Sequence, residues 1–75
     1  MVTDLNPGES ALVESFSDEW TGLKLMHMGL FPGQELKLFH CAPSGDRLVI
    51  ESSGIKIALR RNEASVIQIT AIKKA

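Results

Sequence analysis

The sequence is short of several residue types on which common functions depend. Its 75 residues include no tyrosine, one tryptophan and one cysteine. A single cysteine excludes an internal disulfide, so we expect a reduced, intracellular setting. An adaptor for proline-rich peptides needs a row of aromatic side chains to hold its ligand, and aromatic residues make up only 5% of this chain. The composition therefore disfavours both a disulfide-bonded secreted domain and a peptide adaptor.

Charge and hydropathy bear on two further classes. The net charge of −1 is not the basic footprint of a nucleic-acid-binding domain. No apolar run approaches the roughly 20 residues that cross a bilayer. The first ten residues have neither a basic start nor an apolar stretch, so we expect neither a secretory signal nor membrane insertion. The 44% hydrophobic and 23% charged residues suit a single folded domain over residues 1–75.

Alternating apolar residues and turn residues predict five short strands. These strands are expected at residues 9–16, 34–41, 48–52, 55–60 and 66–72. One short helix is expected at 20–28, between the first two strands, with Asp18 as its N-cap and Gly29 as its stop. Ser53-Gly54 fits a tight hairpin turn, and 60–64 fits one turn of helix before the last strand. No linker or internal repeat is visible.

This pattern is mainly β and fits a small SH3-like five-stranded barrel, with the helix between strands 1 and 2. Closing the sheet would let a short chain share one core and leave little exposed edge. Leu23, Met26 and Leu30 are spaced by three and four, so this face of the helix is expected to cap the open end of the barrel. In the second strand, His40 is placed on the face of Leu38.

The sequence predicts no catalytic site, metal site or cofactor. A dedicated metal site needs three or four ligands that converge on one point. Neighbouring strand residues such as His40 and Cys41 point to opposite faces, so we expect a half-buried histidine and a small buried cysteine. No phosphate-binding glycine loop, nucleophile elbow or carboxylate pair is present. The candidate ligands weighed are His27, Glu35, His40, Cys41, Asp46 and Glu51.

The order of the turn motifs carries a family resemblance. Leu25-x-x-Met28-Gly29-Leu30-x-Pro32-Gly33 precedes Ala42-Pro43-x-Gly45-Asp46, which in turn precedes Ile57-Ala58-Leu59-Arg60. In this order and spacing, the motifs closely resemble the FeoA family, the small cytoplasmic proteins of bacterial ferrous iron uptake. The resemblance runs from Leu5 to Ile69. Trp20 and the pair His40 and Cys41 are not part of the family pattern.

The resemblance implies an SH3-like domain that is not an enzyme and that assists the membrane transporter FeoB from the cytoplasmic side. It implies action by protein contact that modulates FeoB. The same domain also forms the C-terminal module of iron-dependent repressors. The alternative hypothesis is therefore a stand-alone, metal-responsive regulatory domain.

Residues off the expected packed face of the helix are the candidates for partner contact. We expect a patch of Leu25, Met28 and Phe31 to dock FeoB or, by weak self-association, a second copy. Arg60 and Arg61 could meet an acidic partner or a phosphate; otherwise they form a solvated turn paired with Glu63 or Glu51. The full set of predicted contact residues is Lys24, Leu25, His27, Met28, Phe31, Arg60 and Arg61.

Overall fold

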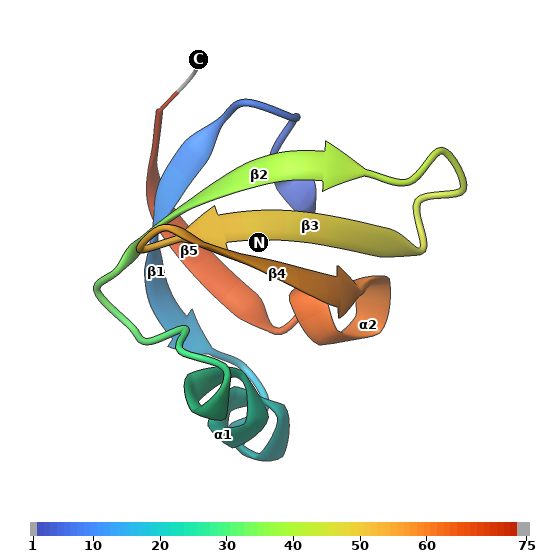
Figure 1. Ribbon diagram of the computed structural model, residues 1–75. Coiled ribbons are helices and arrows are strands. Elements are labelled where there is room, and N and C mark those ends of the chain that lie inside the picture. The colour runs from blue at the N-terminus through green and yellow to red at the C-terminus, as the bar shows by residue number, and fades with distance from the viewer. Residues whose placement is uncertain (1, 74–75) are drawn as a thin grey trace.

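The computed structural model describes residues 2–73. In chain order the elements are η1 (Val2–Asp4), β1 (Ser10–Phe16), α1 (Glu19–His27), β2 (Glu35–Cys41), β3 (Arg47–Ser52), β4 (Ile55–Arg60), α2 (Arg61–Ala64) and β5 (Ile67–Lys73) (Figure 1). Every predicted strand and the predicted helix are present with bounds shifted by at most one residue. No helix in residues 2–73 is long and apolar enough to cross a membrane.

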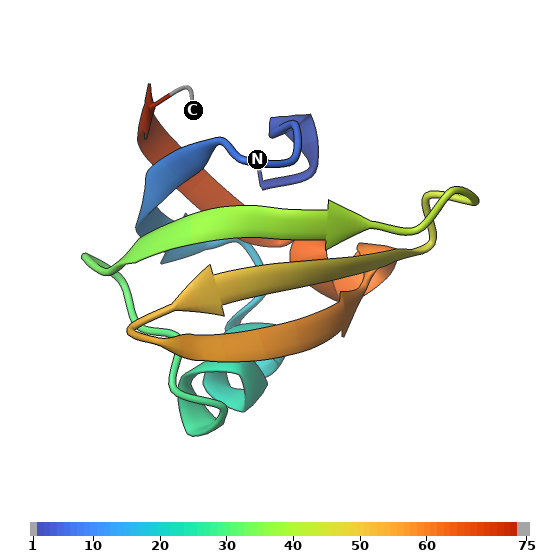
Figure 2. The same ribbon diagram turned by 45° about the horizontal axis from the view of Figure 1, so that its top comes forward.

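The five strands form one antiparallel sheet in the order β4-β3-β2-β1-β5. A closed barrel would need β4 to pair with β5, and the described residues of these two strands do not pair, so the predicted closure is wrong. At the end of β4, the Arg60 N–H donates to Oε1 of Glu63 over 3.0 Å, and α2 then carries the chain away. The sheet is instead strongly curved, with β2, β3 and β4 lying across β1 and β5 (Figure 2).

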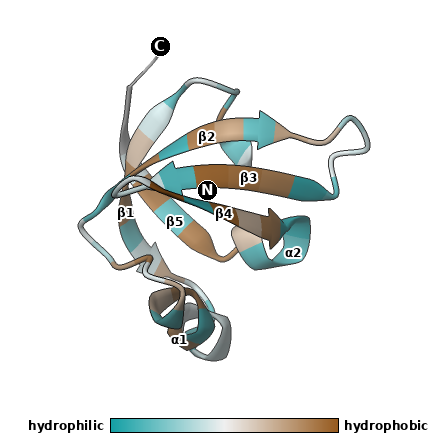
Figure 3. Cartoon of the chain, in the orientation of Figure 1, coloured by the Kyte–Doolittle hydropathy of each residue, from teal (hydrophilic) through white to brown (hydrophobic). Residues whose placement is uncertain are grey.

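The core lies on one side of this curved sheet. Buried and exposed residues alternate along most of β2 and β4, and hydrophobic and hydrophilic residues alternate along the first part of β2 (Figure 3). This is the two-residue period expected of strands with one buried face. The buried hydrophobic residues are Val2, Leu5, Ala11, Val13, Leu25, Leu30, Leu36, Leu38, Leu48, Ile50, Ile57, Leu59, Ala64 and Ile67.

A register shift between β2 and β3 interrupts the alternation. Leu38 pairs with Ile50, but His40 pairs with Val49, whereas regular pairing would place it opposite Leu48. The extra residue leaves both Phe39 and His40 exposed, while Cys41 packs partly against the core. The prediction that His40 shares the face of Leu38 is therefore wrong, because a bulge reverses the sides of the residues that follow it.

The hairpin between β3 and β4 fixes the register of the outer strands. Ser53 and Gly54 have φ values of 53° and 79°, and two consecutive positive values are typical of a type I′ turn. This turn pairs Ser52 with Ile55, and regular pairing then continues to Arg47 opposite Arg60. The predicted tight hairpin is confirmed.

Both ends of α1 are capped by local hydrogen bonds. Asp18 Oδ2 accepts from the Thr21 N–H over 2.9 Å, which confirms the predicted N-cap. The hydrogen bonds from Thr21 also lower the pKa of Asp18. At the other end, the Leu30 N–H donates to the Leu25 carbonyl over 3.1 Å, and Gly29 has a φ of 96°. This bond and the left-handed glycine define a Schellman motif, which ends the helix where the sequence predicts.

The predicted packed face of α1 is wrong, because the helix is rotated so that the residues one position earlier face the core. The helix buries Gly22 and Leu25, whereas Leu23 is 45% exposed. A Cβ atom at position 22 would lie 2.9 Å from Cβ of Phe16, so the helix approaches β1 more closely than any other side chain would allow. This close contact sets the rotation of the helix, and Leu30 reaches the core only after the helix has ended.

Candidate functional site

An open groove of about 770 Å³ separates α1 from the β3–β4 hairpin and α2. Short elements form its walls, so its shape depends on how α1 is held against the rest of the fold. The lining residues are Trp20, Thr21, Lys24 and Met28 from α1 and its C-cap, Arg47, Ala58, Leu59 and Arg60 from the hairpin, and Asn62 and Glu63 from α2.

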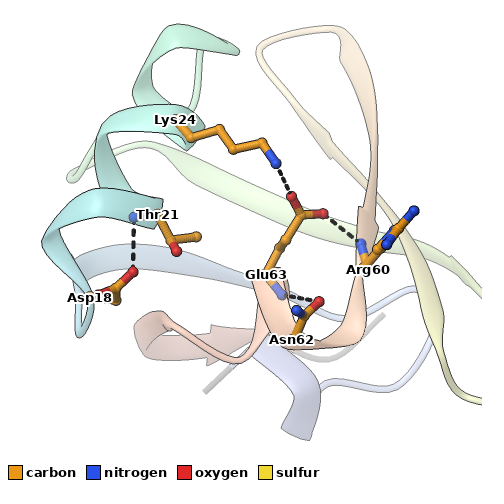
Figure 4. Close-up of polar contacts among 6 residues, drawn as sticks. All are labelled: Asp18, Thr21, Lys24, Arg60, Asn62 and Glu63. Carbon is orange, nitrogen blue, oxygen red and sulfur yellow. Dashed lines mark hydrogen bonds and ion pairs between the residues drawn. The ribbon is translucent and has the colours of Figure 1, made fainter.

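Glu63 joins the two walls of the groove. Its Oε2 atom lies 2.5 Å from Nζ of Lys24 on α1, and its Oε1 atom accepts from the Arg60 N–H at the end of β4 (Figure 4). The Glu63 N–H donates to Oδ1 of Asn62 over 3.0 Å. The hydrogen bonds from Lys24 and Arg60 lower the pKa of Glu63, which keeps the carboxylate ionised. One charged side chain therefore links α1, β4 and α2.

The hairpin wall of the groove is cationic. Arg47 and Arg60 lie directly opposite each other on β3 and β4, and both are exposed. Arg61 points elsewhere, because its Nη1 atom donates to the Gly45 carbonyl over 3.1 Å. A second hollow of about 450 Å³ continues from the groove past these arginines and is lined by Asp46, Arg47, Arg60, Arg61 and Asn62.

The α1 wall of the groove is apolar at two points. Trp20 is 82% exposed and Met28 is 37% exposed. Leu23 and Phe31, which do not line the groove, are 45% and 46% exposed on and just beyond the same helix. Exposed tryptophan and methionine are characteristic of surfaces that bind other proteins.

The structure brings together three of the seven predicted contact residues, Lys24, Met28 and Arg60, in the groove. Arg61 lies beside it, and His27 and Phe31 are exposed outside it. The placement of Leu25 on the exposed face is wrong: Leu25 is fully buried, because it follows Gly22 by three residues on the packed face of α1. The suggested pairing of Arg60 and Arg61 with Glu63 holds only for the Arg60 backbone N–H, since Nζ of Lys24 takes the other oxygen of Glu63.

Trp20, Leu23 and Arg47 are part of this surface but are not among the seven predicted contact residues. Trp20, Leu23, Lys24 and His27 follow the spacing i, i+3, i+4, i+7 and so share one helix face, a signal that the sequence carries. The pairing of Arg47 with Arg60 also follows from the sequence once Ser53-Gly54 is taken as a two-residue turn.

Metal-ligating residues do not gather at the groove. Within residues 2–73, no three His, Cys, Asp or Glu side chains are grouped so that they could hold a metal ion. His40 is exposed on β2, and Cys41 is a free, partly buried thiol. The predicted absence of a catalytic or metal site stays a prediction.

The family model that matches the chain is described as "FeoA domain" and covers residues 1–71. Among solved structures, the FeoA protein from Chlorobium tepidum is 33% identical with a TM-score of 0.82, and the match covers 91% of this chain. The present chain spans 66% of the length of that one.

Two more distant structures share the fold alone. FeoA of Stenotrophomonas maltophilia, solved with zinc, is 24% identical with a TM-score of 0.85, and the match covers 97% of this chain and 94% of that one. It is described as a prokaryotic SH3 domain protein and a candidate activating factor for ferrous iron transport. IdeR of T. acidophilum is 22% identical with a TM-score of 0.77, and the match covers 92% of this chain and 32% of that one.

Proposed function

We propose, because this chain belongs to the FeoA family, that it is an accessory protein of bacterial ferrous iron uptake and that it acts by binding the transporter FeoB. The family is linked to ferrous iron transport. In this proposal the chain works in the cytoplasm, contacts the cytoplasmic side of FeoB and modulates transport without catalysing a reaction itself.

The observation that carries the proposal is the exposed apolar surface on and after α1. Four large hydrophobic side chains, Trp20, Leu23, Met28 and Phe31, are between 37% and 82% exposed within twelve consecutive residues. Side chains that stay in water add almost nothing to the stability of the fold. In protein interfaces, however, aromatic and methionine side chains commonly supply binding energy. The surface therefore supports a function based on protein contact.

The contact surface that we propose omits Leu25 from the sequence-based set and adds Trp20, Leu23 and Arg47. Lys24, Met28 and Arg60 line the groove, and His27 and Phe31 extend the surface along and beyond α1. Arg61 lies at the far end, beside the second hollow. Leu25 supports this surface from the core rather than touching a partner.

A binding experiment with purified FeoB tests the proposal. FeoB in nanodiscs is immobilised, and the chain is titrated over it with GDP, with a non-hydrolysable GTP analogue and without nucleotide. We expect saturable binding, weakened about tenfold or more when Met28 and Phe31 are both replaced by serine. Phe39 is 51% exposed on β2 and lies outside the groove, so Phe39→Ser serves as the matched control.

A cell-based measurement completes the test. A strain that lacks this chain should regain ferrous iron uptake when the wild-type chain or the Phe39→Ser variant is supplied, and should regain less with the double serine variant. Equal rescue by all three, together with equal binding to FeoB, would show that this surface does not mediate the function.

The metal-responsive regulatory domain remains the second candidate. The likeness to IdeR shows a common fold and nothing more, because the identity is 22%. The two candidates predict different responses to metal. A regulatory domain should change its melting temperature or its FeoB affinity in micromolar ferrous iron under anaerobic conditions, whereas an accessory protein that acts by contact alone should change neither.

A further inference from the structure

The outer face of the β3–β4 hairpin carries two cross-strand charge pairs of opposite kinds. Glu51 lies directly opposite Lys56, and Arg47 lies directly opposite Arg60. Directly opposed residues have Cβ atoms about 5 Å apart, so opposite charges stabilise the pairing and like charges repel. The hairpin thus has a favourable pair near its turn and an unfavourable pair at the groove.

In the described part of the chain no carboxylate forms an ion pair with either guanidinium, although the charges of Asp46 and Glu63 attract Arg47 and Arg60. Glu63 already binds Nζ of Lys24 and the Arg60 backbone. Asp46, the other nearby acid, accepts from the Ser44 hydroxyl, and this hydrogen bond lowers the Asp46 pKa. Arg47 and Arg60 therefore remain available to an anionic group from outside the chain.

The opposite wall of the groove favours an apolar group. Trp20 and Met28 line the same groove as Arg47 and Arg60, and Trp20 leaves most of its side chain in solvent. The occupant must then present a negative charge and an apolar side chain close together. A bare phosphate would leave Trp20 uncovered and would meet the carboxylate of Glu63, and the net charge of −1 supplies no broad field to attract a nucleic acid or an anionic membrane.

We propose that the groove binds an acidic segment of the partner protein, with a carboxylate between Arg47 and Arg60 and a neighbouring apolar side chain against Trp20 and Met28. This inference rests on the proposed binding to FeoB and specifies the chemistry of the FeoB segment that docks here. Charge complementarity identifies the occupant, because the groove offers two guanidinium groups that form no ion pair within the described residues, and the partner supplies a carboxylate.

Charge reversal at the arginine pair tests the polar half. We expect Arg47→Glu to weaken binding of the chain to FeoB about tenfold or more and to flatten the dependence of binding on salt. Arg47→Gln, which removes the charge without reversing it, should give a smaller loss. Lys37→Glu makes the same charge change on β2, away from the groove. It places a carboxylate opposite Glu51, so its binding is measured at a temperature where it is fully folded, and it should then alter the affinity less than about twofold.

A stability measurement on the same variants separates docking from folding. Arg47→Glu converts the like-charge pair with Arg60 into an opposite-charge pair, so its melting temperature should rise by about 1–5 °C. A variant that is more stable yet binds FeoB less tightly cannot owe its loss of binding to unfolding. A fall in melting temperature that parallels the loss of binding would overturn the assignment.

Trp20→Ala tests the apolar half, with Phe39→Ala as its control because Phe39 is also exposed but lies outside the groove. We expect about tenfold weaker FeoB binding for Trp20→Ala and less than about twofold for Phe39→Ala. Equal losses for the two variants would overturn the assignment of Trp20 to the docking surface.

The remaining outcomes distinguish the inference from the function on which it rests. If the wild-type chain does not bind FeoB at any salt concentration, both are overturned. If the wild type binds and Arg47→Glu binds equally well, only the docking groove is overturned. Inorganic phosphate that raises the melting temperature of the wild-type chain, but not that of Arg47→Glu, and leaves FeoB binding unchanged at constant ionic strength would assign the arginines to a phosphate instead. Sedimentation showing a dimer that Arg47→Glu dissociates would assign the groove to a second copy.

Discussion

Replacing Leu25 by alanine should cost the fold far more than replacing Met28, three residues later. Leu25 is fully buried on the packed face of α1, whereas Met28 is 37% exposed at the C-cap and lines the groove. Truncating a buried leucine to alanine costs about 2–5 kcal/mol in lost burial and residual cavity. A domain of this length has a free energy of unfolding of about 4–11 kcal/mol, so Leu25→Ala removes a large part of it.

The expected melting temperature of Leu25→Ala is lower than that of the wild type by about 10–30 °C. Met28→Ala should cost less than about 1 kcal/mol, because Met28 is partly hydrated already. Urea unfolding followed by far-ultraviolet circular dichroism gives both values. Fluorescence is a poor probe of this unfolding, since Trp20, the one tryptophan, is already 82% exposed in the folded chain.

The binding of the same two variants to FeoB should show the reverse order. Measured at a temperature where it is folded, Leu25→Ala should bind FeoB nearly as well as the wild type, whereas Met28→Ala should bind less tightly. A loss below about 1 kcal/mol in the unfolding free energy of Leu25→Ala, with an unchanged denaturant slope, would refute the placement of this residue in the core.

Three further perturbations test the packing and the electrostatics. Gly22→Ala gains about 1 kcal/mol of helix propensity, but its Cβ atom would lie 2.9 Å from Cβ of Phe16, a clash that costs about 1–3 kcal/mol. Urea unfolding should therefore show a lower free energy of unfolding, and a more stable variant would contradict the close contact. Glu63 has a pKa below its ordinary value of 4.5, so its contribution to the free energy of unfolding is present above that value and is lost as the pH falls through the lower folded pKa. Glu63→Gln should therefore make the urea midpoint vary less between about pH 6 and about pH 3, and an unchanged pH profile would argue against the ion pair with Lys24. Ser53→Asn should raise the melting temperature by a few degrees, because asparagine tolerates a φ of 53° better than serine; a lower value would contradict the type I′ turn.

Local signals predicted the elements well. Asp18, Gly29 and the Ser53-Gly54 turn each act through hydrogen bonds and dihedral angles within a few residues, so their effects can be read without knowledge of the fold. The strand bounds follow for the same reason, because alternation and turn residues are properties of the local sequence. Each of these predictions agrees with the structure to within one residue.

Predictions that depended on distant contacts were less accurate. The rotation of α1 is set by contact between Gly22 and Phe16, which the spacing of Leu23, Met26 and Leu30 does not reveal. His40 faces solvent because a bulge in the β2–β3 ladder shifts it, and a bulge depends on the partner strand. The exposed position predicted for Leu25 is wrong for the same reason as the predicted rotation of α1.

The number and order of the elements, the turns that join them and the motif order that marks the FeoA family all follow from local sequence patterns. The open sheet and the groove that α1, β4 and α2 form around Glu63 follow from tertiary contacts. The two sets of features differ in the range of the interactions behind them. Caps and turns act within a few residues, whereas Glu63 bonds Lys24 across 39 positions of the chain and so joins the wall that carries Trp20 to the wall that carries the arginine pair.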